Sequence, residues 1–247
     1  MPLLYLSPSL QPYNEYLTGG NEQYYMNRIA DEMEPFLITN GISFERNDIG
    51  TNLRQAINES NEGNYDLHLA IHSNASPPSL SGVIRGTDVY YRPDSYQGKI
   101  AAEIIADNFK NIYPVPSLVK AVPTTTLSEL NLTTAPAVLI ETAYHDNPDD
   151  EKWLKDNIYA IAENLVESLT LYFDIPFISP PQVPMAAVVN TNGGNLNIRS
   201  KPSTDSYIIT SIPDNTNLIV LGTWQDWYVV TTDGITGYAN SAYIDLR

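Results

Sequence analysis

Two short apolar runs in this chain end in side chains that can bind a metal ion or move a proton. Residues 67–71 lead into His72, and residues 137–140 lead into Glu141. Open α/β sheets place their sites at the carboxyl ends of such strands. A histidine at one strand end and a glutamate at a neighbouring one predict a metal ligand and a general base. The chain is therefore expected to be an enzyme.

Each of these residues also has a purely structural interpretation. His72 could be a hydrogen-bonded histidine, but the chain has only three histidines, and two of them, His72 and His145, follow the two apolar runs. Glu141 could cap a helix or pair with an arginine, yet a carboxylate there is costly to bury unless it pairs or coordinates. His68 would lie about 13 Å from His72 along a strand, too far to share an ion with it. We expect His68 to be a packed or hydrogen-bonded residue.

Glu22 is the best-placed carboxylate for a second metal ligand. It lies in the first turn of a predicted helix, where a glutamate also interacts favourably with the helix dipole. Taken alone, the interaction with the helix dipole would be enough to explain a glutamate at this position. The chemistry expected of His72 and Glu141 needs a ligand from another element, and this need favours Glu22.

Strand and helix patterns alternate over the first 174 residues. Strands are predicted at residues 3–7, 43–46, 66–71, 83–91 and 137–141, and the last of these reads as a run buried on both faces. Helices are predicted from Asn21 to Gly41, from a cap at Thr51, over residues 97–112 and over residues 149–173. This alternation predicts an α/β fold, with a three-layer, mostly parallel twisted sheet flanked by helices.

A proline-rich segment ends that pattern. Residues 175–184 form the predicted linker, and four prolines between residues 174 and 184 can continue neither a helix nor a central strand. From residue 185 to 247, five or so short strands alternate with turn signals, a pattern typical of a small β-barrel. Two domains are therefore expected, residues 1–174 and residues 185–247.

Composition limits the partners and the compartment. The 13 basic and 29 acidic side chains give a net charge of −16, which argues against nucleic acid and anionic membranes as partners. No apolar run is long enough to span a membrane, and the first residues lack the features of a signal peptide. The absence of cysteine excludes disulfides and thiolate zinc ligands. The acidic surface favours a monomer.

The motifs around these residues resemble the zinc-dependent N-acetylmuramoyl-L-alanine amidases of the amidase type 3 group. The resemblance covers residues 1–174 and rests on Ser-Pro-Ser at 7–9, the helix start at 22–30, Leu53 to Asn58, Ala-Ile-His-Ser-Asn-Ala at 70–75, and Pro-Ala-Val-Leu-Ile-Glu-Thr-Ala-Tyr-His-Asp-Asn at 136–147. It implies a zinc ion held by Glu22 and His72 and a catalytic base at Glu141. Asn74 and Ser73, which follow His72, could orient its ring, a role that neighbours of a metal ligand often have.

The chain departs from this family at the first zinc ligand, a histidine that the family usually carries after its opening strand. No histidine precedes His68 here, and Gln11 is the nearest polar side chain. An amide oxygen is a weak zinc ligand. We place Gln11 ahead of His145 as the missing ligand, and a site with two protein ligands, or with none, stays open.

The C-terminal part resembles bacterial SH3 (SH3b) domains, in the residues 195–204, 225–230 and 234–243. That resemblance implies binding to peptidoglycan. A lytic domain joined to a wall-binding module is the layout of phage endolysins and autolysins, so we expect an extracellular, cell-wall enzyme, either a prophage endolysin or a trimmed secreted enzyme.

The activity implied is hydrolysis of the amide bond between N-acetylmuramic acid and L-alanine of the stem peptide by zinc-activated water. Two alternatives remain. One is an amidase fold without catalytic activity that acts as a wall-binding module, and the other is a zinc peptidase that cuts within the stem peptide.

Overall fold

The computed structural model describes residues 1–247, the whole chain, and divides into two compact units. One unit consists of Leu3–Met33 and Phe44–Tyr172. The other consists of Met1–Pro2, Glu34–Ser43 and Phe173–Arg247. Between the last helix of the α/β part and the first strand of the C-terminal part, residues 174–184 contain neither helix nor strand.

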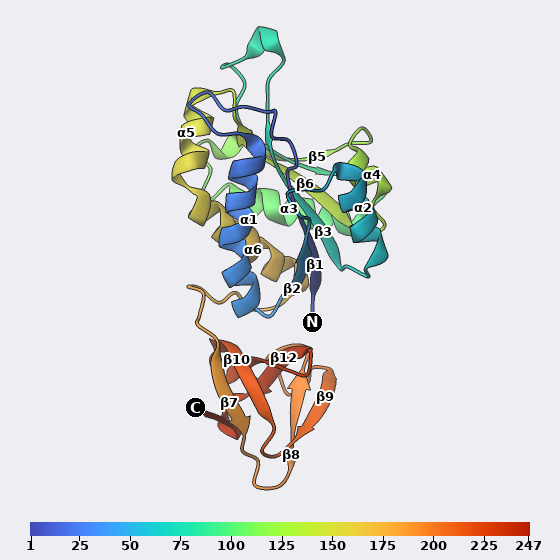
Figure 1. Ribbon diagram of the computed structural model, residues 1–247, viewed down its shortest axis with the longest axis vertical. Coiled ribbons are helices and arrows are strands. Elements are labelled where there is room, and N and C mark those ends of the chain that lie inside the picture. Colours follow the sequence, from blue (N-terminus) through green and yellow to red (C-terminus); the bar gives the residue numbers. More distant parts are fainter. The chain divides into compact units, whose positions relative to one another are not determined.

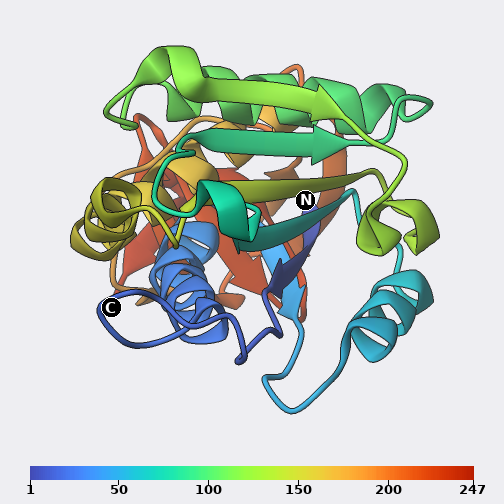
Figure 2. The same ribbon diagram turned by 90° about the horizontal axis from the view of Figure 1, so that it is seen from above.

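A six-stranded sheet carries the α/β part. Its strands follow the order β2-β1-β3-β6-β4-β5, and in Figure 2 five of them lie one above another from β5 down to β1. The pairs β1–β3, β3–β6 and β4–β5 are parallel, whereas β4–β6 is antiparallel. The sheet is therefore mostly parallel, as the sequence predicts. The strands are β1 (Leu3–Pro8), β2 (Ser43–Arg46), β3 (Leu67–Asn74), β4 (Thr87–Tyr91), β5 (Val119–Pro123) and β6 (Ala137–Tyr144).

Helices cover both faces of this sheet. In Figure 1, α1, α5 and α6 lie on one side of the central strands and α2 and α4 lie on the other. Strand residues on both faces are inaccessible to solvent, which is why β3 and β6 read as continuous apolar runs rather than alternating ones. The helices are α1 (Glu22–Thr39), α2 (Leu53–Glu62), α3 (Tyr96–Phe109), α4 (Ser128–Leu132), α5 (Pro148–Asp156) and α6 (Ile158–Phe173).

The predicted signals at the two ends of α1 are confirmed. The Asn21 side chain accepts a hydrogen bond from Tyr24 N at 2.9 Å, which satisfies one free N–H of the first turn. At the other end Gly41 has a φ of +68°, the left-handed conformation that ends helices. Glu22 is thereby fixed as the first residue of the helix.

Three predicted elements need correction. The helix predicted over residues 149–173 is two helices, because Asn157 leaves the helical conformation between α5 and α6. Asn52, not Thr51, caps α2 by accepting from Gln55 N, and the Gln55 side chain completes a capping box. The strand predicted from residue 83 begins at Thr87, after Gly86 at a φ of +133°. The short elements β5 and α4 were not predicted.

The C-terminal part is all β, with seven strands where the sequence suggested five or so. Its strands follow the order β13-β7-β10-β11-β12-β8-β9, and each strand pairs antiparallel with its neighbours. Ten buried residues, among them Ile198, Val220 and Val230, form its core. The strands are β7 (Met185–Val189), β8 (Asn195–Arg199), β9 (Ile208–Pro213), β10 (Asn217–Trp224), β11 (Trp227–Thr232), β12 (Ile235–Asn240) and β13 (Ile244–Leu246).

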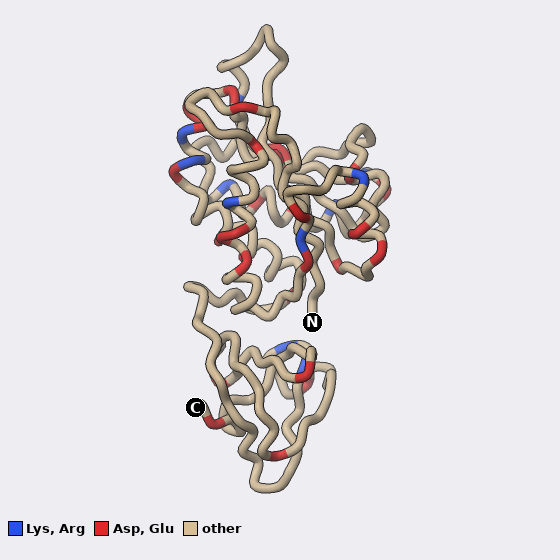
Figure 3. The backbone as a smooth tube through the Cα atoms, in the orientation of Figure 1, with Lys and Arg blue, Asp and Glu red and all other residues tan.

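Acidic side chains outnumber basic ones along the chain, as the tube in Figure 3 shows. None of the helices combines the length and the apolar character that crossing a membrane requires.

A buried aspartate joins α5 to the strands beside it. Asp150 is inaccessible to solvent and accepts hydrogen bonds from Tyr113 Oη at 2.5 Å, Gly86 N at 3.0 Å and Tyr144 N at 3.1 Å. Arg85 Nε lies 3.2 Å from the same carboxylate. Removing one partner of such a buried cluster leaves the others unsatisfied.

We therefore expect Asp150→Ala to lower the free energy of unfolding by about 3–5 kcal/mol in denaturant titrations. Asp149→Ala is the matched control, because Asp149 pairs with the same Arg85 at 3.0 Å but is exposed. Its loss should cost less than about 1 kcal/mol. Equal costs for the two variants would contradict the prediction.

Candidate active site

The sheet brings the predicted functional residues to one edge. In the parallel pairing of β3 with β6, His72 lies directly opposite Glu141. Strand β1 ends at Pro8, opposite Ile71, so the segment that contains Gln11 continues at the same edge. Glu22 begins α1 after that segment, and its N–H donates to Asn14 O at 2.9 Å. Three separate strand ends and one helix start thus converge.

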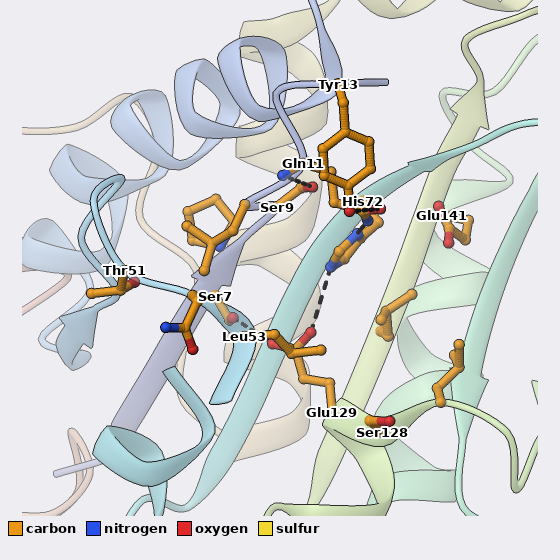
Figure 4. A pocket seen from close by; sticks show the side chains of 15 residues that line it. Ser7, Ser9, Gln11, Tyr13, Thr51, Leu53, His72, Ser128, Glu129 and Glu141 are labelled. Carbon is orange, nitrogen blue, oxygen red and sulfur yellow. Dashed lines mark hydrogen bonds and ion pairs between the residues drawn. The ribbon is translucent and has the colours of Figure 1, made fainter. Parts of the chain in front are cut away.

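A pocket of about 420 Å³ opens where they meet. Figure 4 shows His72 at its centre, with Gln11 on one side, Glu129 on the other and Glu141 across from the imidazole ring. Its further lining comes from the start of α2 and from the segment before α4. Those residues are Thr51, Asn52, Leu53, Leu127 and Ser128.

The imidazole of His72 lies between two carboxylates. Its Nδ1 is 2.8 Å from Glu22 Oε1, and its Nε2 is 3.5 Å from Glu129 Oε2. Burial alone would lower the pKa of His72, but hydrogen bonds to Glu129 and Glu22 outweigh it and raise the pKa well above its ordinary value. Burial likewise would raise the pKa of Glu22, and the bond from His72 lowers it overall. Without another cation, His72 is therefore an imidazolium.

Gln11 lies beside the same ring nitrogen. Its Nε2 is 3.2 Å from His72 Nδ1, and its Oε1 accepts from Tyr13 Oη and from Asn14 Nδ2, each at 3.2 Å. Asn14 Nδ2 also donates to Glu22 Oε2 at 2.6 Å. The atoms that surround Nδ1 are therefore one carboxylate and one amide, both held by neighbouring side chains.

Glu141 differs from the other acids of the pocket because it has no partner. Its Oε2 is shielded from solvent and makes no hydrogen bond. Burial raises the pKa of Glu141 to about 7; the nearby imidazolium of His72 lowers it, while Glu22 and Asp88 raise it further. A carboxyl group with a pKa near neutrality can both accept and donate a proton.

Glu129 is the pocket residue that the sequence analysis missed. It lies on the short helix α4, is buried, and accepts from Ser7 Oγ at 2.5 Å and from His68 Nε2 at 3.0 Å. His68 Nδ1 in turn lies 2.9 Å from Ser60 Oγ. The prediction that His68 is a hydrogen-bonded residue and not a co-ligand agrees with these contacts. The even spacing of His68 and His72 places both on one face of the strand, and it was the one signal in the sequence for an acid that contacts both.

His145 and Asn74 lie outside this pocket. His145 is buried, its Nδ1 is 2.9 Å from Ser73 Oγ, and its ring stacks on Tyr16 with the centroids 5.0 Å apart. The Asn74 side chain accepts from Ala75 N at 2.8 Å. Of the two candidates for the missing ligand, the structure places Gln11, and not His145, beside His72. Asn74 makes no side-chain contact with His72.

No three His, Cys, Asp or Glu side chains are arranged as ligands of a common metal ion. The groups that face Nδ1 of His72 are a single carboxylate and an amide. The pocket thus offers two common metal ligands and one weak one.

The unpaired state of Glu141 should limit stability at high pH. A pKa raised from about 4.5 to about 7 means that the metal-free fold is favoured below pH 4.5 and loses stability as the pH rises through 7. The loss is on the order of 3 kcal/mol. We expect Glu141→Gln to be more stable than the parent at pH 8 and equal at pH 4.5, in denaturant titrations with chelator present. An unchanged pH dependence would contradict this.

Solved structures of amidases have the same fold as the α/β part. The catalytic domain of CwlV, an N-acetylmuramoyl-L-alanine amidase from Bacillus (Paenibacillus) polymyxa var. colistinus, is 20% identical with a TM-score of 0.61, over 71% of this chain and 100% of that chain. The amidase AmiC2 of Nostoc punctiforme is 17% identical with a TM-score of 0.61, over 70% and 97%. The catalytic domain of the CD27L endolysin, which targets Clostridia difficile, is 22% identical with a TM-score of 0.57, over 69% and 97%.

Family comparisons cover both parts of the chain. Among curated proteins, no sequence is similar enough to count as a match. Residues 194–245 match the bacterial SH3 domain family, and residues 14–170 match the family Amidase_3, N-acetylmuramoyl-L-alanine amidase. The second match spans more than half of the chain and includes Glu22, His72, Glu129 and Glu141. The chain therefore belongs to the Amidase_3 family of N-acetylmuramoyl-L-alanine amidases and carries a C-terminal bacterial SH3 domain.

Proposed function

We propose that this protein hydrolyses the amide bond between N-acetylmuramic acid and the L-alanine of the peptidoglycan stem peptide. The observation that carries the proposal is Glu141, a carboxylate without a partner whose pKa lies near 7, which lines the same pocket as His72, the hydrogen-bond partner of Glu22. A general base needs both properties, because it must be free to take a proton at neutral pH. Membership of the amidase family supplies the bond and the substrate class.

The residues around Nδ1 of His72 suit a zinc ion. Imidazole nitrogen and carboxylate oxygen are common zinc ligands, and His72 and Glu22 present them 2.8 Å apart. Gln11 would supply a third, weaker ligand through its amide oxygen. When bound, zinc polarises the scissile carbonyl and lowers the pKa of water. The hydrogen bond from Asn14 to Glu22 Oε2 would hold the carboxylate in place.

Glu141 performs the proton transfers in this proposal. It accepts a proton from the attacking water and passes it to the amine of L-alanine as the amide bond breaks. Glu141 lines the pocket, and no hydrogen bond competes for its Oε2.

The domain layout suits an insoluble substrate. Residues 1–174 would form the catalytic domain, residues 175–184 the linker and residues 185–247 the wall-binding domain. Tethering to peptidoglycan raises the effective concentration of the catalytic domain there. We propose a monomer that acts on the cell wall outside the cytoplasm.

Replacement of the base should abolish hydrolysis. We expect Glu141→Gln to reduce the release of stem peptides from purified sacculi by about 100- to 10,000-fold. Its zinc content should not change. Mass spectrometry of the digest identifies the bond, because only amidase cleavage yields stem peptides that begin with a free L-alanine. Peptides cut internally would instead support a peptidase, and full activity would remove Glu141 from the mechanism.

The ligand role of Gln11 gives a separate prediction about metal affinity. A carboxylate is a stronger zinc ligand than an amide, so Gln11→Glu should bind zinc more tightly and Gln11→Ala more weakly. Competition with a chromophoric chelator measures both affinities. Tyr13→Phe is the matched control, since it removes only the hydroxyl that donates to Gln11 Oε1. Equal affinities for the Glu and Ala variants would exclude Gln11 as a ligand.

A second candidate is a wall-binding protein without hydrolytic activity. The absence of three strong ligands around a common point favours it. Metal analysis separates the two functions, because this candidate holds no stoichiometric zinc after dialysis against zinc-containing buffer yet still sediments with sacculi.

A further inference from the structure

Glu129 lies behind His72, on the side of the ring opposite to Glu22. Nδ1 of His72 faces Glu22 at 2.8 Å, whereas Nε2 faces Glu129 at 3.5 Å, and Figure 4 shows Glu129 on the Nε2 side of the imidazole. Glu129 belongs to α4 and lines the pocket, with only 4% of its surface exposed. It is the only carboxylate in ion-pair contact with Nε2.

Glu129 is itself held by two donors. Its Oε1 accepts from Ser7 Oγ at 2.5 Å and from His68 Nε2 at 3.0 Å, and Ser60 Oγ lies 2.9 Å from the other nitrogen of His68. Both donors act on Oε1, which leaves Oε2 directed at His72. A carboxylate fixed in this way can accept the proton of a histidine and fix the orientation of its ring.

The contacts on the two sides of the ring bear on which nitrogen of His72 can bind a metal ion, because Nδ1 is hydrogen-bonded to Glu22 at 2.8 Å and Nε2 has an ion-pair contact of 3.5 Å with Glu129. A neutral imidazole has one N–H and one lone pair. If Nε2–H points to Glu129, the lone pair lies on Nδ1, beside Glu22 and Gln11, where the proposed function places the metal ion.

We propose that Glu129 is a positioning residue, which binds the Nε2 proton of His72 and thereby reserves Nδ1 as the metal-ligating atom. This inference rests on the proposed function. It adds a fourth acidic or imidazole group to the machinery, together with the Ser7 and His68 contacts that hold it, and it explains why a buried histidine and serine lie behind the pocket.

Substitution by glutamine would reverse the hydrogen-bond polarity. Ser7 and His68 both donate to the Oε1 position, so the amide oxygen of Glu129→Gln should remain there. Its NH₂ group would then face His72 Nε2, which must accept, and the proton would move to Nδ1. The ligating lone pair would be lost although the shape of the side chain is preserved.

The test measures zinc affinity by chelator competition and the ring nitrogens of His72 by ¹⁵N NMR, which is practical because the chain has only three histidines. In the unsubstituted zinc-loaded protein we expect a protonated Nε2 and a metal-bound Nδ1. In Glu129→Gln we expect zinc affinity to fall by about 10- to 100-fold and the metal-free protein to show the Nδ1–H tautomer at high pH.

Asp88→Asn is the matched control. Asp88 lies opposite Glu141 in the sheet but does not line the pocket. Its replacement by asparagine removes the same unit of charge as Glu129→Gln does. Its zinc affinity should stay within about twofold of the parent, because long-range charge alone is not the cause proposed.

Each other result overturns the proposal. Zinc bound to Nε2 in the parent protein would overturn it without any variant. A zinc affinity of Glu129→Gln equal to that of the parent would also overturn it, and so would a loss of zinc affinity in Asp88→Asn as large as in Glu129→Gln. A parent chain that takes up no zinc overturns the proposed function and this assignment together. If the parent binds zinc and releases stem peptides but one of those results is found, only the role assigned to Glu129 has failed.

Discussion

Concentrated negative charge in a partly enclosed pocket is the constraint on which the rest of the site depends. Glu22, Glu129 and Glu141 all lie around the single imidazole of His72. Taking a carboxylate out of water costs several kcal/mol unless a partner compensates it. In the metal-free protein the imidazolium of His72 compensates the charges of Glu22 and Glu129. Glu141 has no such partner, so burial and repulsion from the other acids raise its pKa. One positive charge cannot serve three acids, so the third, Glu141, holds its proton up to a pH of about 7.

The sheet creates this arrangement through strand register. Parallel pairing of β3 with β6 sets His72 opposite Glu141, and the pairing of β1 with β3 ends one residue earlier, which delivers Gln11 to the same edge. Because side chains alternate along a strand, His68 and His72 share a face, and α4 lies over that face with Glu129. A shift of one residue in the pairing of β3 with β6 would turn His72 and Glu141 to opposite faces of the sheet and separate them.

The sequence predicts those parts of the site that follow from strand ends and helix starts. His72, Glu22 and Glu141 come together because each is adjacent to a strongly patterned element, and Gln11 follows the first strand. Glu129 was not predicted, since α4 is a five-residue helix with no periodicity to read. The break at Asn157 was missed for a related reason: α5 and α6 are both amphipathic, and a change of helix direction leaves the apolar spacing nearly continuous. His145 was placed near the metal by extended spacing from Glu141, but β6 ends at Tyr144 and the chain then turns toward Ser73.

The neutral charge of Gln11, the residue beside Nδ1, affects how strongly this site would attract a divalent ion. Gln11 lies beside Nδ1 with a neutral amide, so it adds no charge to the acids around His72. A divalent ion that replaces the Nδ1 proton of His72 adds one net positive charge to a pocket with three acids. The attraction of those acids acts at short range in a medium less polar than water, where it is stronger than at an exposed surface. Electrostatic attraction from Glu22, Glu129 and Glu141 would thus offset part of the affinity that a weak amide ligand costs a bound divalent ion.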